Sequence, residues 1–173
     1  GQYFQLPAYT VMGYRNNNNE LVNKNKEITY INNKHLVFGI ETTPGNFSKI
    51  TLEGFYKKYN NYPISFVDGV SIANKGAGFE VLVNERILTE GKGKSYGLEF
   101  LYQQKLKNNF YGILSYTFFY SKFSGFDNIF LPSVWDNRHL FSFTGGYKLK
   151  KNWEVSSKIR FTGKTPYAPV NLN

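Results

Sequence analysis

Apolar and polar side chains alternate along two neighbouring stretches near the middle of the chain, residues 96–105 and 110–122. Successive side chains of a strand point to opposite faces of its sheet. One face of the first stretch therefore carries Tyr96, Leu98, Phe100 and Tyr102, and one face of the second carries Phe110, Leu114, Tyr116, Phe118 and Tyr120. Glu99, Gln103, Lys105, Ser115, Thr117 and Ser121 occupy the opposite faces. The alternation predicts a long hairpin with one apolar and one polar face.

The same pattern predicts two more hairpins, over residues 34–59 and 138–163. Thr43-Pro44-Gly45-Asn46 has the composition of a tight turn, and Lys150-Lys151-Asn152 turns the last hairpin. We expect loops in the stretches between and around the hairpins, which are residues 1–33, 60–95, 123–137 and 164–173. Short strands at 63–67 and 79–83 could interrupt the longest of these loops. Strand, short turn, strand and long loop thus repeat three times.

Each predicted strand holds about ten residues, where an ordinary globular strand has about five or six. At ~3.3 Å per residue and ~40° of tilt, ten or eleven residues cross the ~25 Å apolar band of an outer membrane. Aromatic residues at strand ends fit an interfacial girdle: Tyr56, Tyr102, Tyr147 and Trp153. We therefore predict an all-β, antiparallel, up-and-down transmembrane β-barrel segment of about six strands, with long extracellular loops. The alternative is a soluble antiparallel β-sandwich that binds glycans through exposed aromatic side chains.

Composition changes this interpretation little. Aromatic residues make up 18% of the 173 residues, while charged residues fall to 19% and leave a net charge of +9. The mean hydropathy of −0.43 is compatible with alternating strands. No stretch approaches the ~20 apolar residues of a membrane helix, so a helical span is excluded. The positive charge fits solvated loops, or attraction to anionic lipid headgroups or anionic ligands.

The chain does not begin as a signal peptide does, because Gly1-Gln2-Tyr3-Phe4 is not a basic stretch followed by an apolar run. Its last residues have loop chemistry. Since a protein of the outer membrane must be exported, we expect this chain to be an internal piece of a longer one.

Sequence motifs for catalysis or for binding of nucleotides, metals or nucleic acids are weak. Gly91-Lys92-Gly93-Lys94-Ser95 suggests a phosphate loop, but Leu88 stands where the pattern needs glycine and a strand follows, so a flexible basic loop is the better interpretation. The absence of cysteine, with two histidines and scattered carboxylates, predicts no catalytic residues, no metal site and no cofactor. The segment Lys94–Phe100 only loosely resembles an RNA-binding strand, so we expect no nucleic-acid partner.

Two sets of residues are candidates for a site. Asp136, Arg138 and His139 cluster before the last hairpin and are expected to form a polar network at the outer rim that orders the loop. Aromatic residues of the long loops are candidates for stacking on a glycan or a siderophore, or for packing the loops and the interfacial girdle: Tyr59, Tyr62, Phe66, Phe123, Phe126, Phe130 and Trp135.

Several segments, taken in order, resemble later barrel strands of TonB-dependent outer-membrane receptors, and most of all those of Bacteroidetes-type bacteria. These segments are Ser95–Leu101, Ile113–Thr117, Pro132–His139 and Gly163–Tyr167. The resemblance covers about residues 34–170, and residues 1–33 match mainly through Gly1–Leu6.

The resemblance implies a barrel of about 22 strands in the bacterial outer membrane, filled by a plug domain and energised through TonB. This chain would then supply part of the C-terminal half of the barrel and carry out no enzymatic reaction. Its expected partners are outer-membrane lipid, the rest of the barrel and the plug, TonB through the missing N-terminal part, and, left open, a surface lipoprotein. The function implied is uptake of a scarce nutrient such as a siderophore or a glycan.

Overall fold

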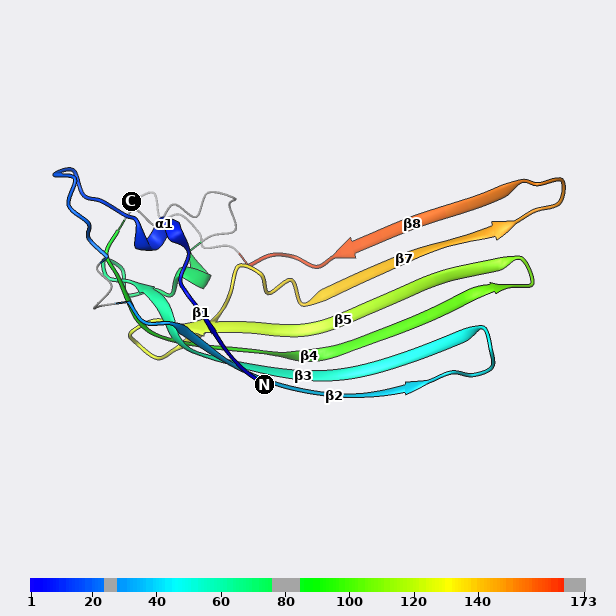
Figure 1. Cartoon of the computed structure of the whole chain (residues 1–173), viewed down its shortest axis with the longest axis horizontal. Coiled ribbons are helices and arrows are strands. Elements are labelled where there is room, and N and C mark those ends of the chain that lie inside the picture. The colour runs from blue at the N-terminus through cyan, green and yellow to red at the C-terminus, as the bar shows by residue number, and fades with distance from the viewer. Residues whose placement is uncertain (24–27, 76–84, 167–173) are drawn as a thin grey trace.

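The computed structural model describes residues 1–23, 28–75 and 85–166, whose strands form one antiparallel sheet (Figure 1). The strands are β1 (Gln2–Gln5), β2 (Ile31–Thr42), β3 (Ser48–Ser65), β4 (Ile87–Lys107), β5 (Phe110–Ser124), β6 (Phe130–Pro132), β7 (His139–Lys148) and β8 (Glu154–Thr162). Their order across the sheet is β1-β2-β3-β4-β5-β7-β8, with β6 beside β5. The predicted all-β antiparallel fold class is confirmed.

Three short turns lie together at one end of the sheet, on the right of Figure 1. The β2–β3 turn contains Gly45 at φ +81°, and the β4–β5 turn consists of Asn108 and Asn109 at φ +50° and +67°. Lys151 and Asn152 both adopt φ +61° between β7 and β8. Glycine and asparagine tolerate this left-handed conformation best, which is why they occur in all three hairpin turns.

The opposite end of the sheet, which we call the loop end, carries the longer connections, the short helix α1 (Tyr9–Met12) and the 3-10 helix η1 (Ile72–Asn74) (Figure 1). The predicted loop 60–95 is wrong at both ends, because β3 continues to Ser65 and β4 already begins at Ile87. Residues 63–67 therefore contain the end of β3, and the predicted strand 79–83 lies outside the described residues.

Two glycines explain why β4 is longer than predicted. Gly91 and Gly93 lie opposite Tyr62 and Tyr59 of β3, inside the sheet. A Cβ atom at Gly91 would lie 2.6 Å from the Tyr62 carbonyl oxygen, and one at Gly93 would collide with the Phe123 ring. Glycine inside a strand commonly marks such a close approach. The segment Gly91–Ser95 is thus strand, and its interpretation as a flexible basic loop is wrong.

The loops predicted at 1–33 and 123–137 also contain strands. In the first, β1 pairs with β2 so that Gln2 lies opposite Lys34, and β2 begins at Ile31. In the second, β5 runs on to Ser124 and β6 pairs with it. Both additions are short segments without a long alternation, which explains why the pattern did not predict them.

The cross-strand register divides the sheet into an apolar and a polar face, because residues directly opposite each other share a face. A typical row of the apolar face is Ile40, Leu52, Phe100, Tyr116, Phe141 and Phe161. The next row, on the polar face, is Glu41, Thr51, Leu101, Ser115, Ser142 and Arg160. The predicted alternation of the strands is therefore continuous across the whole sheet.

The apolar face is uncovered within the described part of the chain. Phe38 is 75% exposed and Leu98, in a central strand, is 55% exposed. The buried apolar side chains of the described residues lie elsewhere, at the loop end: Val11, Ile64, Ala73, Ile87, Phe123 and Val134. The described strands form a single sheet, so no second sheet packs on the apolar face as a sandwich would require. In the described segments, no helix is long and apolar enough to cross a membrane.

Aromatic side chains border the apolar face at both ends. Tyr56, Tyr96 and Tyr120 lie side by side towards the loop end, with ring centroids 6.3 and 5.2 Å apart, and we call them the tyrosine row. Phe110 and Tyr147 pair at the turn end. Phe110 and Tyr120 are ten residues apart in β5, which corresponds to about 25 Å across a membrane at ~40° of tilt.

Candidate functional site

A cavity of about 450 Å³ lies at the loop end, and polar-face residues of β2–β5 line it. Five aromatic side chains line it and define what we call the aromatic pocket: Tyr3, Tyr59, Tyr62, Phe123 and Trp135. The Phe123 ring lies 4.4 Å from that of Tyr62 and 5.3 Å from that of Tyr59, measured between centroids. The centroids of Tyr59 and Tyr62 are 6.2 Å apart with the rings nearly perpendicular.

The pocket is built by an irregularity in the sheet. Asn33, Tyr59, Gly93 and Phe123 form one row of the polar face, and Gly93 leaves room for the Phe123 ring to reach Tyr59. The register shifts between Tyr59 and Tyr62, where Asn61 adopts φ +56°. Such a bulge redirects the following side chain. Here Tyr62 comes to lie beside Phe123.

Polar atoms accompany the rings. Asn33 lines the pocket, and its side-chain oxygen is buried without a hydrogen-bond partner among the described residues. Ser121 also lines it and accepts a hydrogen bond from Ser133 at 2.8 Å. Aromatic walls with a few fixed polar groups suit a ligand that has a flat or ring-shaped apolar face and hydrogen-bond donors.

The structure brings four of the seven aromatic candidates together, namely Tyr59, Tyr62, Phe123 and Trp135. The other three lie elsewhere on the loops. Phe66 packs under the Arg86 guanidinium at 4.7 Å, and Phe130 lies under Lys94 Nζ at 4.5 Å. Phe126 is 41% exposed and lies against Gly69.

The polar residues at the beginning of β7 form two separate groups. Asp136 is fully buried in its side chain and accepts two hydrogen bonds from Arg138, from Nε at 3.1 Å and Nη2 at 3.3 Å. The guanidinium of Arg138 stacks 3.9 Å from the Tyr120 ring. His139 instead forms a hydrogen bond of 2.8 Å with the Tyr116 hydroxyl. Two of the three residues of the predicted rim network, Asp136 and Arg138, are therefore in contact, and His139 makes its hydrogen bond elsewhere.

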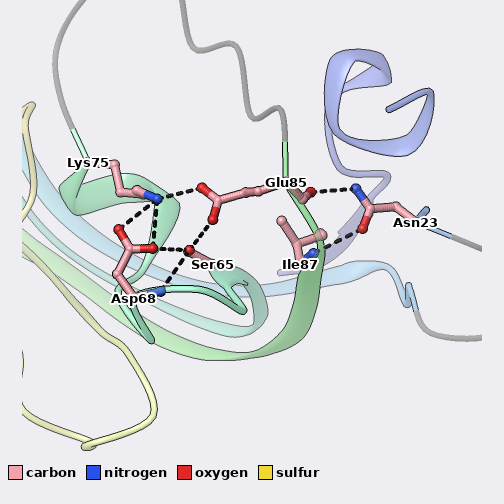
Figure 2. A network of polar contacts seen from close by, with 6 residues as sticks. All are labelled: Asn23, Ser65, Asp68, Lys75, Glu85 and Ile87. Carbon is pink, nitrogen blue, oxygen red and sulfur yellow. Dashed lines mark hydrogen bonds and ion pairs between the residues drawn. The ribbon is translucent and has the colours of Figure 1, made fainter. Parts of the chain in front are cut away.

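A polar cluster, the loop anchor, joins the loop between β3 and β4 to the strand ends, and its residues are Ser65, Asp68, Lys75 and Glu85 (Figure 2). Lys75 Nζ lies 2.8 Å from Asp68 Oδ2 and also pairs with Glu85. Ser65 contacts both carboxylates. Because its ions are paired with one another, this cluster serves to fix the loop.

Asn23 ties the N-terminal segment to the same region (Figure 2). Its buried amide donates to the Val11 carbonyl at 2.7 Å and to the Glu85 carbonyl at 3.0 Å, and its oxygen accepts from Ile87 N at 2.9 Å. One side chain thus joins the segment around α1 to the beginning of β4. This holds Val11, which also lines the cavity, close to the beginning of β4.

Comparison with known proteins identifies the fold. No family model matches the sequence, and no curated protein matches it. Solved structures do match over 95% of this chain at 17% identity. The complex of FpvAI with pyocin S2 has a TM-score of 0.62, and the pyoverdine outer membrane receptor FpvA of Pseudomonas aeruginosa PAO1, bound to pyoverdine, has 0.61. The ferripyoverdine receptor of the same species, bound to ferripyoverdine, also has 0.61.

The fold is that of a segment of a TonB-dependent receptor barrel. The chain spans 20–22% of the length of these solved chains. At 17% identity the likeness establishes the fold alone. The matched proteins are bacterial outer-membrane receptors and not enzymes.

Sequence reasoning missed Tyr3 and Asn33 of the pocket, and it missed the loop anchor. Asn33 could have been found by extending the alternation, since it continues the polar face of β2 through Val37 and His35. The position of Tyr3 depends on the pairing of β1 with β2, and the loop anchor depends on how the loop folds. No local sequence pattern predicts either of them.

The loop anchor should weaken in acid. The hydrogen bond from Lys75, followed by that with Ser65, holds the pKa of Asp68 below its ordinary value. A carboxyl group with a lowered pKa in the folded state stabilises fully above its unfolded pKa and loses that contribution as the pH falls through the folded value. We expect amide hydrogen exchange of residues 65–75, corrected for intrinsic rates, to speed up below about pH 4.

The Asp68→Asn substitution should remove most of this pH dependence. A matched control is Lys49→Met, which breaks the Lys49–Glu41 ion pair of 2.7 Å at the turn end. This control should leave exchange of the loop unchanged. Equal acid sensitivity in the wild type and in Asp68→Asn would contradict a role of this carboxylate.

Proposed function

We propose that this chain is part of the wall of an outer-membrane, TonB-dependent receptor that takes up a nutrient, and that the aromatic pocket contributes to its external ligand site. The observation that carries this proposal is the two-faced sheet, with one continuous apolar face and short turns gathered at one end. Barrels of the outer membrane have short periplasmic turns and longer extracellular loops. The barrel fold of the matched receptors supports the same assignment.

The orientation follows from the loops. With the short turns in the periplasm, the loop end faces the outside and the polar face lines the lumen. The aromatic pocket, on the polar face at the loop end, then faces incoming ligand. A siderophore or a glycan has the ring-shaped or flat faces that such a pocket accommodates.

The remaining barrel strands and the plug domain would lie in other parts of a longer protein. Within the described residues β8 pairs only with β7, and barrels require every edge to be paired. We propose that neighbouring strands complete a barrel of about 22 strands around a plug domain that contacts TonB, with the transmembrane strands in contact with outer-membrane lipid. A mass of only ~20 kDa for the protein from its source would contradict this, as would a monodisperse preparation free of detergent.

Removing a pocket ring should reduce uptake. In cells that depend on the full-length protein, we expect Tyr62→Ala to weaken binding of the transported ligand about three- to tenfold, because a stacked ring contributes ~0.5–1.5 kcal/mol beyond its buried area. Uptake of a panel of radiolabelled ferric siderophores and oligosaccharides measures the effect.

Phe66→Ala is the matched control, since Phe66 is an exposed loop aromatic outside the pocket. It should leave uptake unchanged. Both variants should retain the heat-resistant gel mobility of an assembled barrel. Normal uptake by assembled Tyr62→Ala and Phe123→Ala variants would contradict the pocket as a ligand site.

A further inference from the structure

Four lysines form a single row across the apolar face. Lys34, Lys58, Lys94 and Lys122 lie directly opposite one another on β2, β3, β4 and β5. We call this set the lysine row. It lies two residues beyond Tyr56, Tyr96 and Tyr120 of the tyrosine row, on the side of the loop end. Adjacent strands are about 4.8 Å apart, so four positive charges lie within about 15 Å.

Such an arrangement is unfavourable on its own, because like charges directly opposite each other on a sheet destabilise it. Two of the ammonium groups contact rings, with Lys94 Nζ 4.5 Å from Phe130 and Lys122 Nζ 5.6 Å from Tyr120. Across the paired positions of the apolar face from β2 to β8 no residue is acidic. The nearby cation Arg138 is already neutralised by Asp136. At these paired positions no carboxylate therefore compensates the positive charge of the lysine row.

An apolar groove begins directly below the lysine row. Gly54 forms part of its floor, and Lys94 lines it together with Leu98, Phe118 and Tyr120. The groove has a volume of about 610 Å³. Gly54 places no side chain in the groove, and a Cβ there would make only ordinary contact with Leu98, at 3.5 Å, so a side chain can be introduced at this position. Positive charge, an aromatic border and an apolar groove thus follow one another along the same face.

We propose that the lysine row and this groove bind a phosphorylated lipid of the outer leaflet, with its phosphates on the ammonium groups and an acyl chain over Gly54. The inference rests on the proposed function, since it places the apolar face in lipid. The tyrosine row marks the interface, and the lysine row lies about 5 Å further out, at headgroup depth. Long lysine stems extend along apolar surface while their charges stay at the polar boundary.

The test uses the full-length protein in zwitterionic detergent, with bound lipid counted by native mass spectrometry. Lipid A with its two phosphates is compared with dephosphorylated lipid A, which has the same acyl chains. Each lysine near an anionic lipid surface strengthens binding about fivefold. We expect at least tenfold weaker lipid A binding when all four are changed, in the variant Lys34→Gln, Lys58→Gln, Lys94→Gln and Lys122→Gln.

The matched control removes four charges away from the lysine row, by Lys148→Gln, Lys150→Gln, Lys151→Gln and Lys158→Gln. It should bind lipid A within twofold of the wild type. Gly54→Leu fills the groove and should weaken lipid A and dephosphorylated lipid A about equally. Millimolar inorganic phosphate should not displace lipid A, and full displacement would show a site for free phosphate instead.

Unchanged binding in the fourfold variant would overturn the proposal, and so would equal affinity for both forms of lipid A in the wild type. Unchanged binding in Gly54→Leu would remove the acyl-chain site. These outcomes can be told apart from a failure of the proposed function. If only the lipid site is wrong, the protein still needs detergent and still runs as a heat-resistant barrel. A protein that is not a barrel meets neither condition.

Discussion

Arginine in place of Leu52 should prevent assembly of the protein in the membrane. Leu52 lies on the apolar face of the central strand β3, 42% exposed, and four residues from Tyr56 of the tyrosine row. This distance is about 10 Å in depth, close to the middle of the ~25 Å apolar band. An arginine on the lipid face costs about 2–4 kcal/mol at that depth. We expect the assembled, heat-resistant band on a gel to fall more than tenfold.

The adjacent residue supplies the matched control. Thr51 lies on the polar face and borders a cavity that Glu53 and Glu99 also line. Arginine at position 51 would meet water and two carboxylates, so Thr51→Arg should assemble nearly as well as the wild type. Equal loss in both variants would point to a general defect of β3. Normal assembly of Leu52→Arg would contradict lipid contact with the apolar face.

Alanine in place of Arg138 should destabilise the external rim. The substitution leaves the buried Asp136 carboxylate without its cation. Breaking a buried ion pair in this way costs about 3–5 kcal/mol, and we expect roughly 1–3 kcal/mol here because the Arg138 side chain remains 35% exposed. It also removes the guanidinium that stacks 3.9 Å from Tyr120. The temperature at which the barrel loses its heat-resistant mobility should fall by several degrees.

A double substitution separates the charge from the packing. In Arg138→Ala with Asp136→Ala, no unpaired carboxylate remains, so part of the lost stability should return. Asp136→Asn alone keeps the shape and removes the charge, and it should be milder than Arg138→Ala. Unchanged heat-resistant migration of Arg138→Ala would contradict a stabilising role of the Arg138–Asp136 ion pair. A double variant less stable than either single variant would show that packing, not charge, dominates.

The regular part of the sheet could be predicted from the sequence, because alternation and turn residues are local signals. The turns are predicted by Gly45, Asn108 and Asn109, which favour positive φ. The two faces of β4 and β5 are predicted by the alternation of apolar and polar residues along each strand. The strand ends at the loop end could not be predicted in this way. The bulge at Tyr59–Tyr62 breaks the alternation, and Gly91 and Gly93 resemble loop residues until Phe123 is known to pack on them.

The candidate site was predictable in part for the same reason. The aromatic residues Tyr59, Tyr62, Phe123 and Trp135 could be proposed as external candidates, but their meeting in one pocket depends on register. His139 was grouped with Asp136 and Arg138 because they are neighbours in the chain. In the structure His139 forms a hydrogen bond with Tyr116, whereas Arg138 bonds Asp136 and stacks on Tyr120, so the histidine is not part of that pair.

The length of β4 determines how far the receptor would project from the cell. Nine residues separate Tyr96 from Ile87, the first residue of the strand. In the proposed barrel, at ~3.3 Å per residue and ~40° of tilt, they would form a collar rising about 20 Å above the lipid surface. Cargo would first touch protein in this collar, clear of the bilayer, and bulky molecules could dock there without entering the channel. Antibodies should reach the same collar on intact cells.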